Sequence, residues 1–520
     1  MLACTIVAAL LAAWASIPVM LHSMHMFQLN GYKFPEQCRW LRRNASRQWI
    51  LGLGLLLGVF RLFFPHAALD AAICLVLLLE IPVYRAKERL ASKKKLVFTP
   101  RVRRMFATIA LLVALAVAAT AVFAGPAPLA GLFAILASAQ LVLNLPANLL
   151  NSPLEAAINR RYVNEAKRLL AASPRLKTIG VTGSYGKTSM KFFLRELLRD
   201  RFEVLATPGN FNTPLGVTRT VRGSLKPTHE IFICEMGARR VGEIREICEI
   251  AHPSVGIVTA IGPQHLETFR TVENILSTKF ELADALPPGG MLFLNGDDPL
   301  IREKAASYLS KTFYFCETTG DGYQARDVAV SPFGTEFSVV APDGATERFQ
   351  MKLLGKHNVL NVVGAIAVAH SLGIPLKDLK APVRRLRPVE HRMQLRDRGN
   401  VTIIDDAYNS NPAGARAAVE TLAMMDGLRI LVTPGMVELG EREFECNREF
   451  GARAAACCDF ILLVGRKRAV PIRQGALEKG FPTEKCLVFD TLEEALARAR
   501  AIPSTARKFI LLENDLPDNY

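Results

Sequence analysis

The chain has 520 residues, of which 50% are hydrophobic and 22% charged, and its mean hydropathy is +0.20. This length has room for about three domains, and the composition excludes a disordered chain, a coiled coil and a collagen-like fibre. The net charge of +16 is uneven, because residues 1–170 hold 19 Lys+Arg against 6 Asp+Glu while the rest hold 45 against 42. A basic excess inside an apolar segment favours membrane topology, so we expect no nucleic-acid partner.

Five apolar runs occupy the first 150 residues and predict a multi-pass membrane section with about five transmembrane helices. The runs cover residues 1–22, 49–64, 67–84, 105–124 and 127–149. A helix needs roughly 20 apolar residues to cross the hydrocarbon core, so the shorter second and third runs could be two tilted spans or one re-entrant hairpin. The first run has no Lys or Arg before it, and we therefore interpret it as a retained span rather than a cleavable signal.

Basic residues between the runs predict the orientation in the membrane. The loops 23–48 and 85–104 hold five and nine Lys+Arg, whereas the connections near residues 65 and 126 hold none. Loops rich in Lys and Arg usually remain on the cytoplasmic side of a membrane. We therefore expect an external N-terminus, a cell-membrane location, and everything after residue 150 in the cytoplasm.

Three charged side chains lie within the apolar runs. Arg61 is expected to snorkel to the membrane surface. Asp70 and Glu80 are either interfacial or bundle-facing carboxylates or, as the alternative, part of a polar transport path.

A glycine-rich loop, Thr-Gly-Ser-Tyr-Gly-Lys-Thr-Ser over residues 182–189, stands between a predicted strand and a predicted helix. Backbone N–H groups at such a turn converge on phosphate oxygens, a lysine neutralises the outer phosphates, and a Thr hydroxyl holds Mg²⁺. The spacing from Gly180 to Gly186 is one residue longer than the strict phosphate-loop pattern, so a glycine turn with a surface lysine is the alternative. The candidate ATP-binding residues here are Gly183, Ser184, Tyr185, Gly186, Lys187, Thr188 and Ser189.

Two further residues are candidate metal ligands. Glu235 ends a predicted buried strand over residues 230–235, where a carboxylate near a phosphate loop would hold a hard cation or would instead act as a cap. His265 follows the predicted strand 255–261 through a Gly-Pro turn, and its spacing alone favours a structural role.

Further short motifs follow the glycine-rich loop along the chain, in the order in which a known protein family has them. With the loop included, they lie at residues 182–188, 207–216, 235–238, 242–244, 265–267, 279–281, 295–298, 357–361, 405–412 and 435–440. Together they make residues 175–515 resemble the Mur ligase family. The last two motifs most resemble the branch that adds D-alanyl-D-alanine to UDP-N-acetylmuramoyl-tripeptide. A bacterial origin and a role in cell-wall peptidoglycan synthesis are the matching expectations.

The resemblance implies an ATP-dependent ligase in which a substrate carboxylate attacks the γ-phosphate and an amine then displaces phosphate from the acyl phosphate. It implies Mg²⁺, with two ions as an option, held by Thr188, Glu235, His265 and a carbamylated Lys279, which Glu281 would orient. It assigns Lys187, Lys279, His265 and Arg392 to catalysis, with Arg392 reaching the γ-phosphate when the last domain closes. The further nucleotide-binding candidates are Asn295, Asp298, Asn358, Arg392, Asp406, Tyr408 and Asn409, and His357 is either a nucleotide contact or a core histidine.

The expected fold class is a multi-pass α-helical membrane section followed by two α/β domains. A polar connector covers residues 151–175, a phosphate-loop-type ATPase domain 176–385, and a Rossmann-like domain 386–520. Strands of the last domain are predicted at residues 402–405, 429–432, 460–464, 486–489 and 509–512, with a helix at 492–502.

Two departures from the family shape the expected substrate. Apolar residues stand where the soluble enzymes have a domain that grips the UDP-sugar, which favours a lipid-linked or membrane-proximal acceptor. The family's Lys-Gly-Ser-Arg stretch is replaced by Leu-Glu-Asn-Asp-Leu-Pro-Asp-Asn-Tyr at residues 512–520, an acidic segment that does not suit an acidic incoming amino acid. The alternatives are a poly-γ-glutamate or capsule-type polymer synthase, a non-catalytic nucleotide-binding membrane protein, and an ATP-driven transporter, which the few intramembrane charges disfavour.

Overall fold

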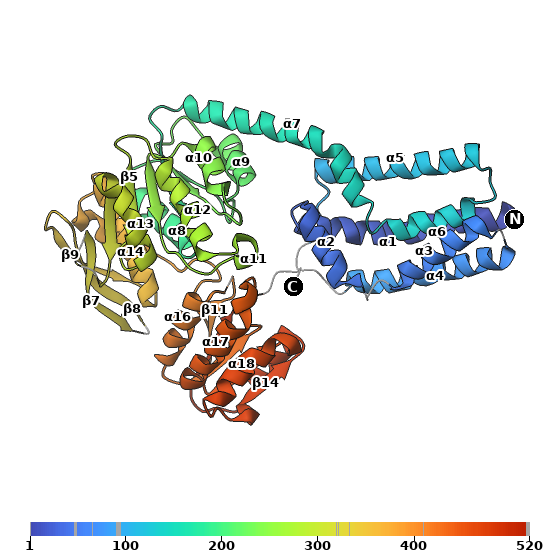
Figure 1. Cartoon of the computed structure of the whole chain (residues 1–520). Helices are drawn as coiled ribbons and strands as arrows, with labels where there is room; N and C mark the ends of the chain where they lie inside the picture. The colour runs from blue at the N-terminus through green and yellow to red at the C-terminus, as the bar shows by residue number, and fades with distance from the viewer. Residues whose placement is uncertain are drawn as a thin grey trace. The chain divides into compact units, whose positions relative to one another are not determined.

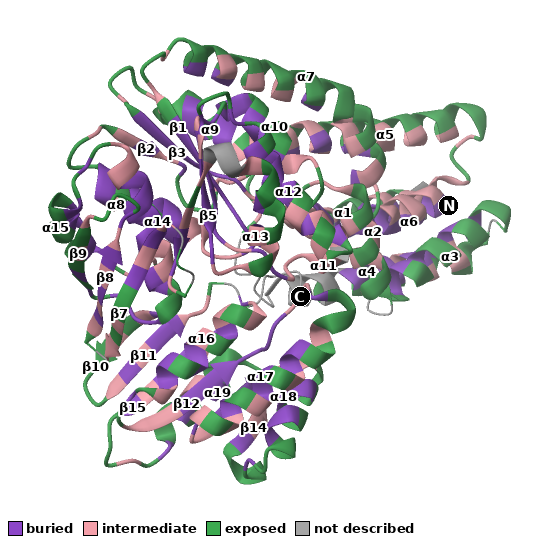
Figure 2. Cartoon of the chain, turned by 60° about the vertical axis from the view of Figure 1, so that its left-hand side comes forward, coloured by how far each residue is buried: buried purple, intermediate pink, exposed green. Residues whose placement is uncertain are grey.

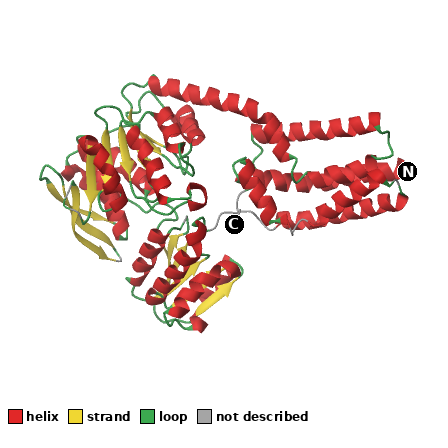
Figure 3. Cartoon of the chain, in the orientation of Figure 1, coloured by secondary structure: helices red, strands yellow, loops and turns green. Residues whose placement is uncertain are grey.

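A computed structural model describes residues 2–45, 49–64, 66–89, 95–318, 320, 322–331, 333–408 and 410–515. The chain divides into two compact units, residues 1–160 and residues 161–516. We refer to them as the helical unit and the α/β unit. Helix α7 (Asn144–Ala171) runs from one into the other, and the strands that the structure describes all belong to the α/β unit (Figures 1 and 3).

The helical unit follows the apolar runs of the sequence. Its helices are α1 (Leu2–Leu29), α2 (Phe34–Arg43), α3 (Trp49–Phe63), α4 (Ala67–Arg89), α5 (Pro100–Phe123) and α6 (Leu129–Ala139), followed by the first part of α7. Alanines pack α1 against α4 and α6, with Ala12, Ala15, Ala134 and Ala137 buried around Ile73 and Leu77. Small side chains let the helix backbones approach closely, as in membrane bundles.

Fewer helices are long and apolar enough to cross a membrane than the five predicted spans. Within the described residues, Thr5–Leu29 and Pro100–Phe123 have the required length and composition, and the bent pair α6 and α7 would make a third span. Helix α3 has 15 residues, which at 1.5 Å per residue reaches about 22 Å, short of the roughly 30 Å hydrocarbon core. Helix α4 carries Asp70 and Glu80 and ends in basic residues.

The fifth apolar run, predicted as one span, is broken after Ala139 and bends by 69° between α6 and α7. Pro146 lies in the first turn of α7 and has no backbone N–H with which the helix could continue from α6. Ser23 then stabilises the bend, because its hydroxyl donates to the Leu141 carbonyl at 2.5 Å. The Asn144 side-chain amide in turn donates to the Ser23 hydroxyl at 3.0 Å. These bonds satisfy polar groups that a helix end would otherwise leave without partners.

Arg61 does not snorkel as predicted. Its guanidinium is buried, and Nε lies 2.5 Å from Oδ1 of Asp70, which is equally buried. The pair joins α3 to α4. Glu80 is fully buried too, and neither carboxylate oxygen has a hydrogen-bond partner among the described residues.

The first sheet of the α/β unit has nine strands in the order β2-β3-β1-β4-β5-β6-β7-β8-β9. Strands β1 to β7 pair in parallel, and β7, β8 and β9 form an antiparallel extension. The strands are β1 (Lys177–Thr182), β2 (Val204–Ala206), β3 (Ile231–Glu235), β4 (Val255–Val258), β5 (Met291–Asn295), β6 (Thr312–Cys316), β7 (Tyr323–Ser331), β8 (Gly334–Val340) and β9 (Thr346–Met351).

Helices cover both faces of this sheet, as the alternation of side chains along the strands requires. In β3, Ile231 and Ile233 belong to one core while Phe232 and Cys234 belong to the other. The first face carries α8 (Lys187–Leu198), α14 (Lys356–Ser371), η3 (Leu376–Leu379) and α15 (Lys380–Arg385). The second carries the end of α7, α9 (Pro214–Ser224), α10 (Glu243–Ala251), α12 (Val272–Asp284) and α13 (Pro299–Ala305). Figure 2 shows β1, β3 and β5 of this sheet as largely buried.

Short segments complete this part of the chain. They are α11 (Leu266–Phe269) and η2 (Ala306–Lys311).

The second sheet has six strands in the order β10-β11-β15-β12-β13-β14. They are β10 (Gln394–Arg398), β11 (Val401–Asp406), β12 (Leu428–Thr433), β13 (Phe460–Val464), β14 (Cys486–Phe489) and β15 (Lys508–Glu513). The five predicted strands are confirmed. Strand β10 was not predicted and pairs antiparallel with β11.

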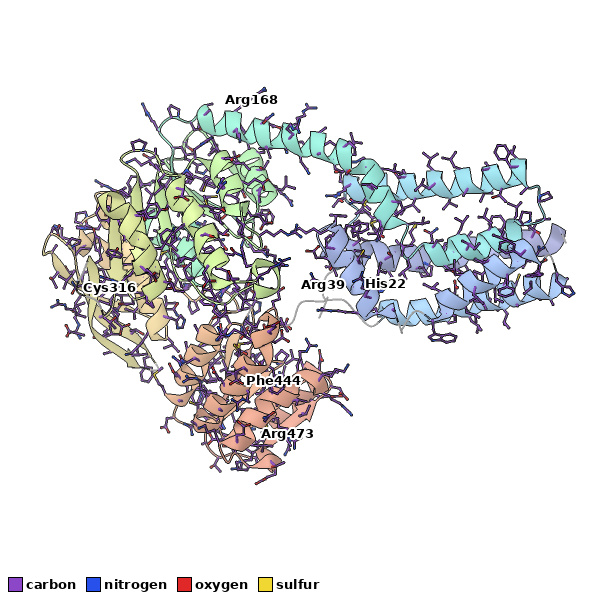
Figure 4. The ribbon with its side chains drawn as sticks, viewed as in Figure 1. His22, Arg39, Arg168, Cys316, Phe444 and Arg473 are labelled. Atoms are coloured by element: carbon purple, nitrogen blue, oxygen red, sulfur yellow. The ribbon has the colours of Figure 1, made fainter. Side chains whose placement is uncertain are left out.

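Helices again lie on both faces of the second sheet. One face packs against α16 (Pro412–Ala423), α17 (Glu443–Cys457) and α18 (Arg466–Glu478), and the other against α19 (Leu492–Ala501), the predicted helix. Figure 4 labels Phe444 on α17 and Arg473 on α18. The short segments η4 (Gly440–Arg442) and η5 (Thr483–Lys485) precede α17 and β14.

Candidate active site

The glycine-rich loop joins the end of β1 to the start of α8, as predicted. Gly183 and Gly186 have φ values of 143° and 79°, where only glycine is free of strain. A side chain at Gly183 would also collide with Thr259, whose hydroxyl lies 2.1 Å from the position of a Cβ atom. The two glycines therefore let the backbone turn tightly at the N-terminus of α8, where N–H groups favour an anion.

Lys187 folds back over this loop. Its ammonium donates to the carbonyls of Gly183 at 2.7 Å and Ser184 at 3.1 Å. Burial lowers the pKa of Lys187 to about 8, although Glu235 raises it. The lysine charge therefore lies at the loop before any phosphate is bound, and an anion there would favour the charged form.

Glu235 lies at the end of β3, next to the loop, and is almost fully buried. The Thr188 hydroxyl and the Asn212 amide donate to its Oε1 at 3.0 and 3.1 Å. Burial would raise the pKa of Glu235, but Lys191 and Lys187 outweigh it and leave the pKa below its ordinary value. The carboxylate is therefore kept ionised beside the loop.

Lys191 is a buried residue of this cluster that sequence reasoning missed. Its ammonium lies 2.9 Å from Oε2 of Glu235 and donates to the Gly209 carbonyl at 2.5 Å. The lysine thus connects α8, β3 and the loop after β2. A signal was present, because Lys191 is four residues after Lys187 and so shares its face of the helix.

Lys279 lies on α12 and is 3% exposed. Burial and the nearby Lys187 lower its pKa far below the ordinary value, against the effect of Glu243 and Glu281. Glu281, which was predicted to orient a carbamylated Lys279, also has a structural task. Its two oxygens accept the backbone N–H groups of Gly242 and Arg245 at 2.8 and 2.9 Å, so it caps the start of α10.

His265 precedes α11 and forms a hydrogen bond through Nδ1 with Oε2 of Glu438, which follows β12. Burial lowers the pKa of His265, while Glu438 raises it. Arg239 lies on the other side, with Nη2 3.6 Å from Oε1 of Glu438. Sequence reasoning placed Glu438 in a motif but gave it no role, although it follows a predicted strand at the sheet edge where ligands bind.

A pocket beside the loop is lined from both sheets. Tyr185, Gly186, Ser189, Asn295, His357 and Asn358 come from the first part of the α/β unit, and Arg392, Asp406 and Asn411 from the second. The Arg392 Nε is buried and has no hydrogen-bond partner among the described residues. Burial raises the pKa of Asp406 to about 6 and lowers that of His357 to about 4. The pocket therefore offers a cationic donor with unused hydrogen-bonding capacity.

The donors present fit a hard cation in part. Mg²⁺ is usually held by one or two carboxylates, with substrate phosphates and water completing its shell, and the Thr188 hydroxyl and Glu235 supply two oxygens of that kind. Among the described residues, no three His, Cys, Asp or Glu side chains converge on one point. Any cation bound here would therefore take part of its coordination from the nucleotide.

Comparisons with known proteins agree with this geometry. The model of the Mur ligase middle domain matches residues 181–369, and that of the Mur ligase glutamate ligase domain matches residues 391–512. The UDP-N-acetylmuramoyl-tripeptide–D-alanyl-D-alanine ligase of Bacillus subtilis is 32% identical over 66% of this chain and 75% of its own length. The Escherichia coli enzyme is 30% identical over the same shares.

Solved structures give the same picture. MurF from Acinetobacter baumannii superposes with a TM-score of 0.63 at 26% identity, covering 70% of this chain and 78% of its own. MurF from Thermotoga maritima in complex with ADP superposes with a TM-score of 0.61 at 28% identity, covering 69% of this chain and 80% of its own. The chain belongs to the Mur ligase family. It is an ATP-dependent ligase that forms amide bonds.

Within this Mur ligase, some predicted nucleotide residues have structural tasks. The Ser184 hydroxyl donates to the Gly262 carbonyl at 3.0 Å. Asp298 caps α13, accepting from Leu300 and Ile301, and also accepts from the Ile261 N–H at 2.8 Å. These two side chains hold the walls of the pocket and are not among its lining residues.

Asn295 and Asn358 line the pocket of this Mur ligase while their amides donate to the carbonyls of Thr259 and Leu354. Tyr408 is 42% exposed, and the Arg392 guanidinium lies 4.6 Å from the centre of its ring. The predicted residue Asn409 lies outside the described residues.

Proposed function

We propose that this chain is a membrane-anchored Mur ligase that joins an amine to a carboxylate of a cell-envelope precursor through an acyl phosphate. The substrate class follows the named relatives, which act on UDP-N-acetylmuramoyl-tripeptide and D-alanyl-D-alanine. The helical unit supports the anchor, since α1 and α5 are long and apolar enough to cross a membrane. A multi-pass arrangement with the α/β unit in the cytoplasm follows from the basic loops.

The observation that carries the proposal is the cluster of Lys187, Thr188, Glu235 and Lys191 beside a pocket that Arg392 enters from the C-terminal part of the α/β unit. Phosphoryl transfer depends mainly on positioning and on neutralising charge. Lys187 and Arg392 would supply two cations to a bound triphosphate. Thr188 and Glu235 supply oxygens for Mg²⁺, which would neutralise the phosphate charge when it is bound.

The chain's own residues would then act in sequence. Lys187 leaves the loop carbonyls for the β- and γ-phosphates, and Arg392 stabilises the charge of the transferred group. The substrate carboxylate attacks the γ-phosphorus, and ADP leaves. The amine then attacks the acyl carbon, loses a proton and displaces inorganic phosphate. Asn295, Asn358 and Asp406 hold the nucleotide and exclude water from the pocket.

Lys279 fits carbamylation, a modification that turns a lysine into an anion. The side chain is buried on α12, and its low pKa favours the neutral amine that reacts with CO₂. The carbamate oxygens of Lys279 and the imidazole nitrogen of His265 would then bind a second cation. Mass spectrometry of the intact protein in bicarbonate, with and without Lys279→Ala, would detect the added mass.

The acceptor that we favour is lipid-linked, because the phosphate loop follows apolar helices through α7 and so would work close to a membrane surface. The decisive experiment incubates the full chain in nanodiscs with Mg-ATP, D-alanyl-D-alanine and either a lipid-linked or a UDP-linked muramoyl-tripeptide. Phosphate release and product mass are measured for each. Lys187→Ala serves as the inactive control, and Lys177→Ala, an exposed residue at the start of β1, serves as the matched active one.

We expect ADP, phosphate and an amide product, with the lipid-linked acceptor preferred. Product formed from the UDP-linked acceptor alone would reject the lipid-linked assignment and leave the ligase chemistry intact. ATP-independent condensation, or full activity in Lys187→Ala, would reject the chemistry.

A further inference from the structure

Glu438 and His265 form a contact between the two sheets of the α/β unit. His265 follows β4 of the first sheet, and Glu438 follows β12 of the second, 173 residues later. The side chains are 18% and 19% exposed, so the hydrogen bond between Nδ1 and Oε2 is largely shielded from solvent. Arg239 adds a cation 3.6 Å from the other carboxylate oxygen.

Both partners have left-handed backbone conformations, with φ of 55° at His265 and 65° at Glu438. Such a conformation is strained for a non-glycine residue and persists only where the surroundings hold it in place. Asn447 holds the Glu438 loop in this conformation. Its side chain accepts from the Met436 N–H at 2.9 Å and donates to the Met436 carbonyl at 3.0 Å. The loop that carries Glu438 is therefore held in place by the fold.

The chemistry of the contact fixes the imidazole. An ionised carboxylate only accepts hydrogen bonds, so the proton of a neutral His265 resides on Nδ1. The lone pair is then on Nε2, the form in which histidine binds a cation. Metal-bound histidines regularly donate their other N–H to a carboxylate, which sets the tautomer and the ring orientation.

We propose that Glu438 is a positioning residue that sets the tautomer and orientation of His265 for a divalent cation bound with the nucleotide. The inference rests on the proposed function, which assigns His265 to that cation. Because Glu438 comes from the second sheet and His265 from the first, the cation site is complete only when the two parts of the α/β unit are in contact. Closure and cation binding are thereby coupled.

The test measures Mn²⁺ binding to the full chain in detergent with saturating ADP, by electron paramagnetic resonance. Glu438→Ala should weaken the second Mn²⁺ by about 10- to 100-fold. Glu438→Gln should keep binding within a few-fold of the wild type, because its amide oxygen still accepts from Nδ1. Glu441→Ala is the matched control, since Glu441 is an exposed carboxylate three residues away.

A second measurement covers the case in which Glu438→Ala fails to fold. If the glutamate acts through the imidazole, His265→Ala and the double variant His265→Ala/Glu438→Gln should bind Mn²⁺ equally weakly. Wild-type affinity in Glu438→Ala, or equal losses in the Gln and Ala variants with unchanged melting temperatures, would overturn the inference. A wild-type chain that binds ADP but takes up no Mn²⁺ would overturn the proposed cation site along with it.

Discussion

Buried ion pairs occur in both units of the chain, but their surroundings differ. In the helical unit, Arg61 and Asp70 form a bidentate pair, with Nε–Oδ1 and Nη2–Oδ2 distances of 2.5 and 3.3 Å. In the α/β unit, the Lys191–Glu235 pair at 2.9 Å is extended by Thr188, Asn212 and the Gly209 carbonyl. The first pair joins two helices, whereas the second belongs to a network at the phosphate loop.

The difference teaches how to separate a structural pair from a functional one. A buried pair costs desolvation that its attraction only partly offsets. A closed pair such as Arg61–Asp70 uses both donors of one guanidinium edge on the two oxygens of a single carboxylate. The Glu235 carboxylate is instead shared among three side chains, Thr188 and Lys191 of α8 and Asn212 of the loop before α9, so that a cation could replace some of its donors.

The largest expected effect is on the phosphate-loop side. Lys187→Ala should lower ATP-dependent turnover by about 10³-fold, because a cation that stabilises phosphoryl transfer is lost. Turnover is measured as ADP release, with Lys177→Ala beside it. If the Ala variant at 187 turns over as fast as the control, the loop is not the site of transfer.

Removal of the Lys191 charge should have the next largest effect. Lys191→Met should reduce turnover by about 100-fold, since Glu235 and the loop at Gly209 lose the group that positions them. Steady-state rates and the melting temperature should be measured together. Near-normal turnover in a folded variant would show that this pair is as structural as Arg61–Asp70.

The helical pair should affect stability and leave catalysis unchanged. Asp70→Asn should destabilise the protein by about 3 kcal/mol, because it leaves Arg61 buried without a countercharge. The double variant Arg61→Leu/Asp70→Leu should recover most of this loss. Thermal melting in detergent and turnover per folded molecule test both statements, and a turnover defect in the double variant would contradict the comparison.

The smallest effect concerns pH. Burial raises the pKa of Glu513 to about 7, while Ser410 and Thr433 donate to its carboxylate. The folded chain thus holds a proton that the unfolded chain releases near its ordinary pKa of about 4.3, and stability falls as pH rises from about 4.5 to 7. Glu513→Gln should raise the melting temperature at pH 8 by about 2 to 4 °C. An unchanged pH profile would show that Glu513 is already ionised.

Local patterns in the sequence were sufficient for much of this fold. Runs such as residues 460–464 are short and apolar and match β13 to the residue, and the glycine-rich loop needs only its own backbone to form. Asp298 could also have been read correctly, because an Asp directly before Pro299 is a helix N-cap signal.

Other features depend on contacts between distant residues. The break between α6 and α7 has a local signal in Pro146, but the hydrogen bond that holds the bend comes from Ser23, more than 110 residues earlier. The pairing of His265 with Glu438 likewise has no local signature. The sequence does not distinguish a buried lysine such as Lys191 from a surface lysine, and only the fold shows that it is buried.

The position of β15 has a consequence for synthesis of the protein. This strand is the last of the second sheet in chain order, yet it lies between β11 and β12 and pairs with both. Until residue 513 has left the ribosome, β11 and β12 present unpaired edges, which other chains could join. A nascent chain that stalls before this point would therefore be prone to aggregate, and we expect it to depend on chaperones until the final strand is inserted.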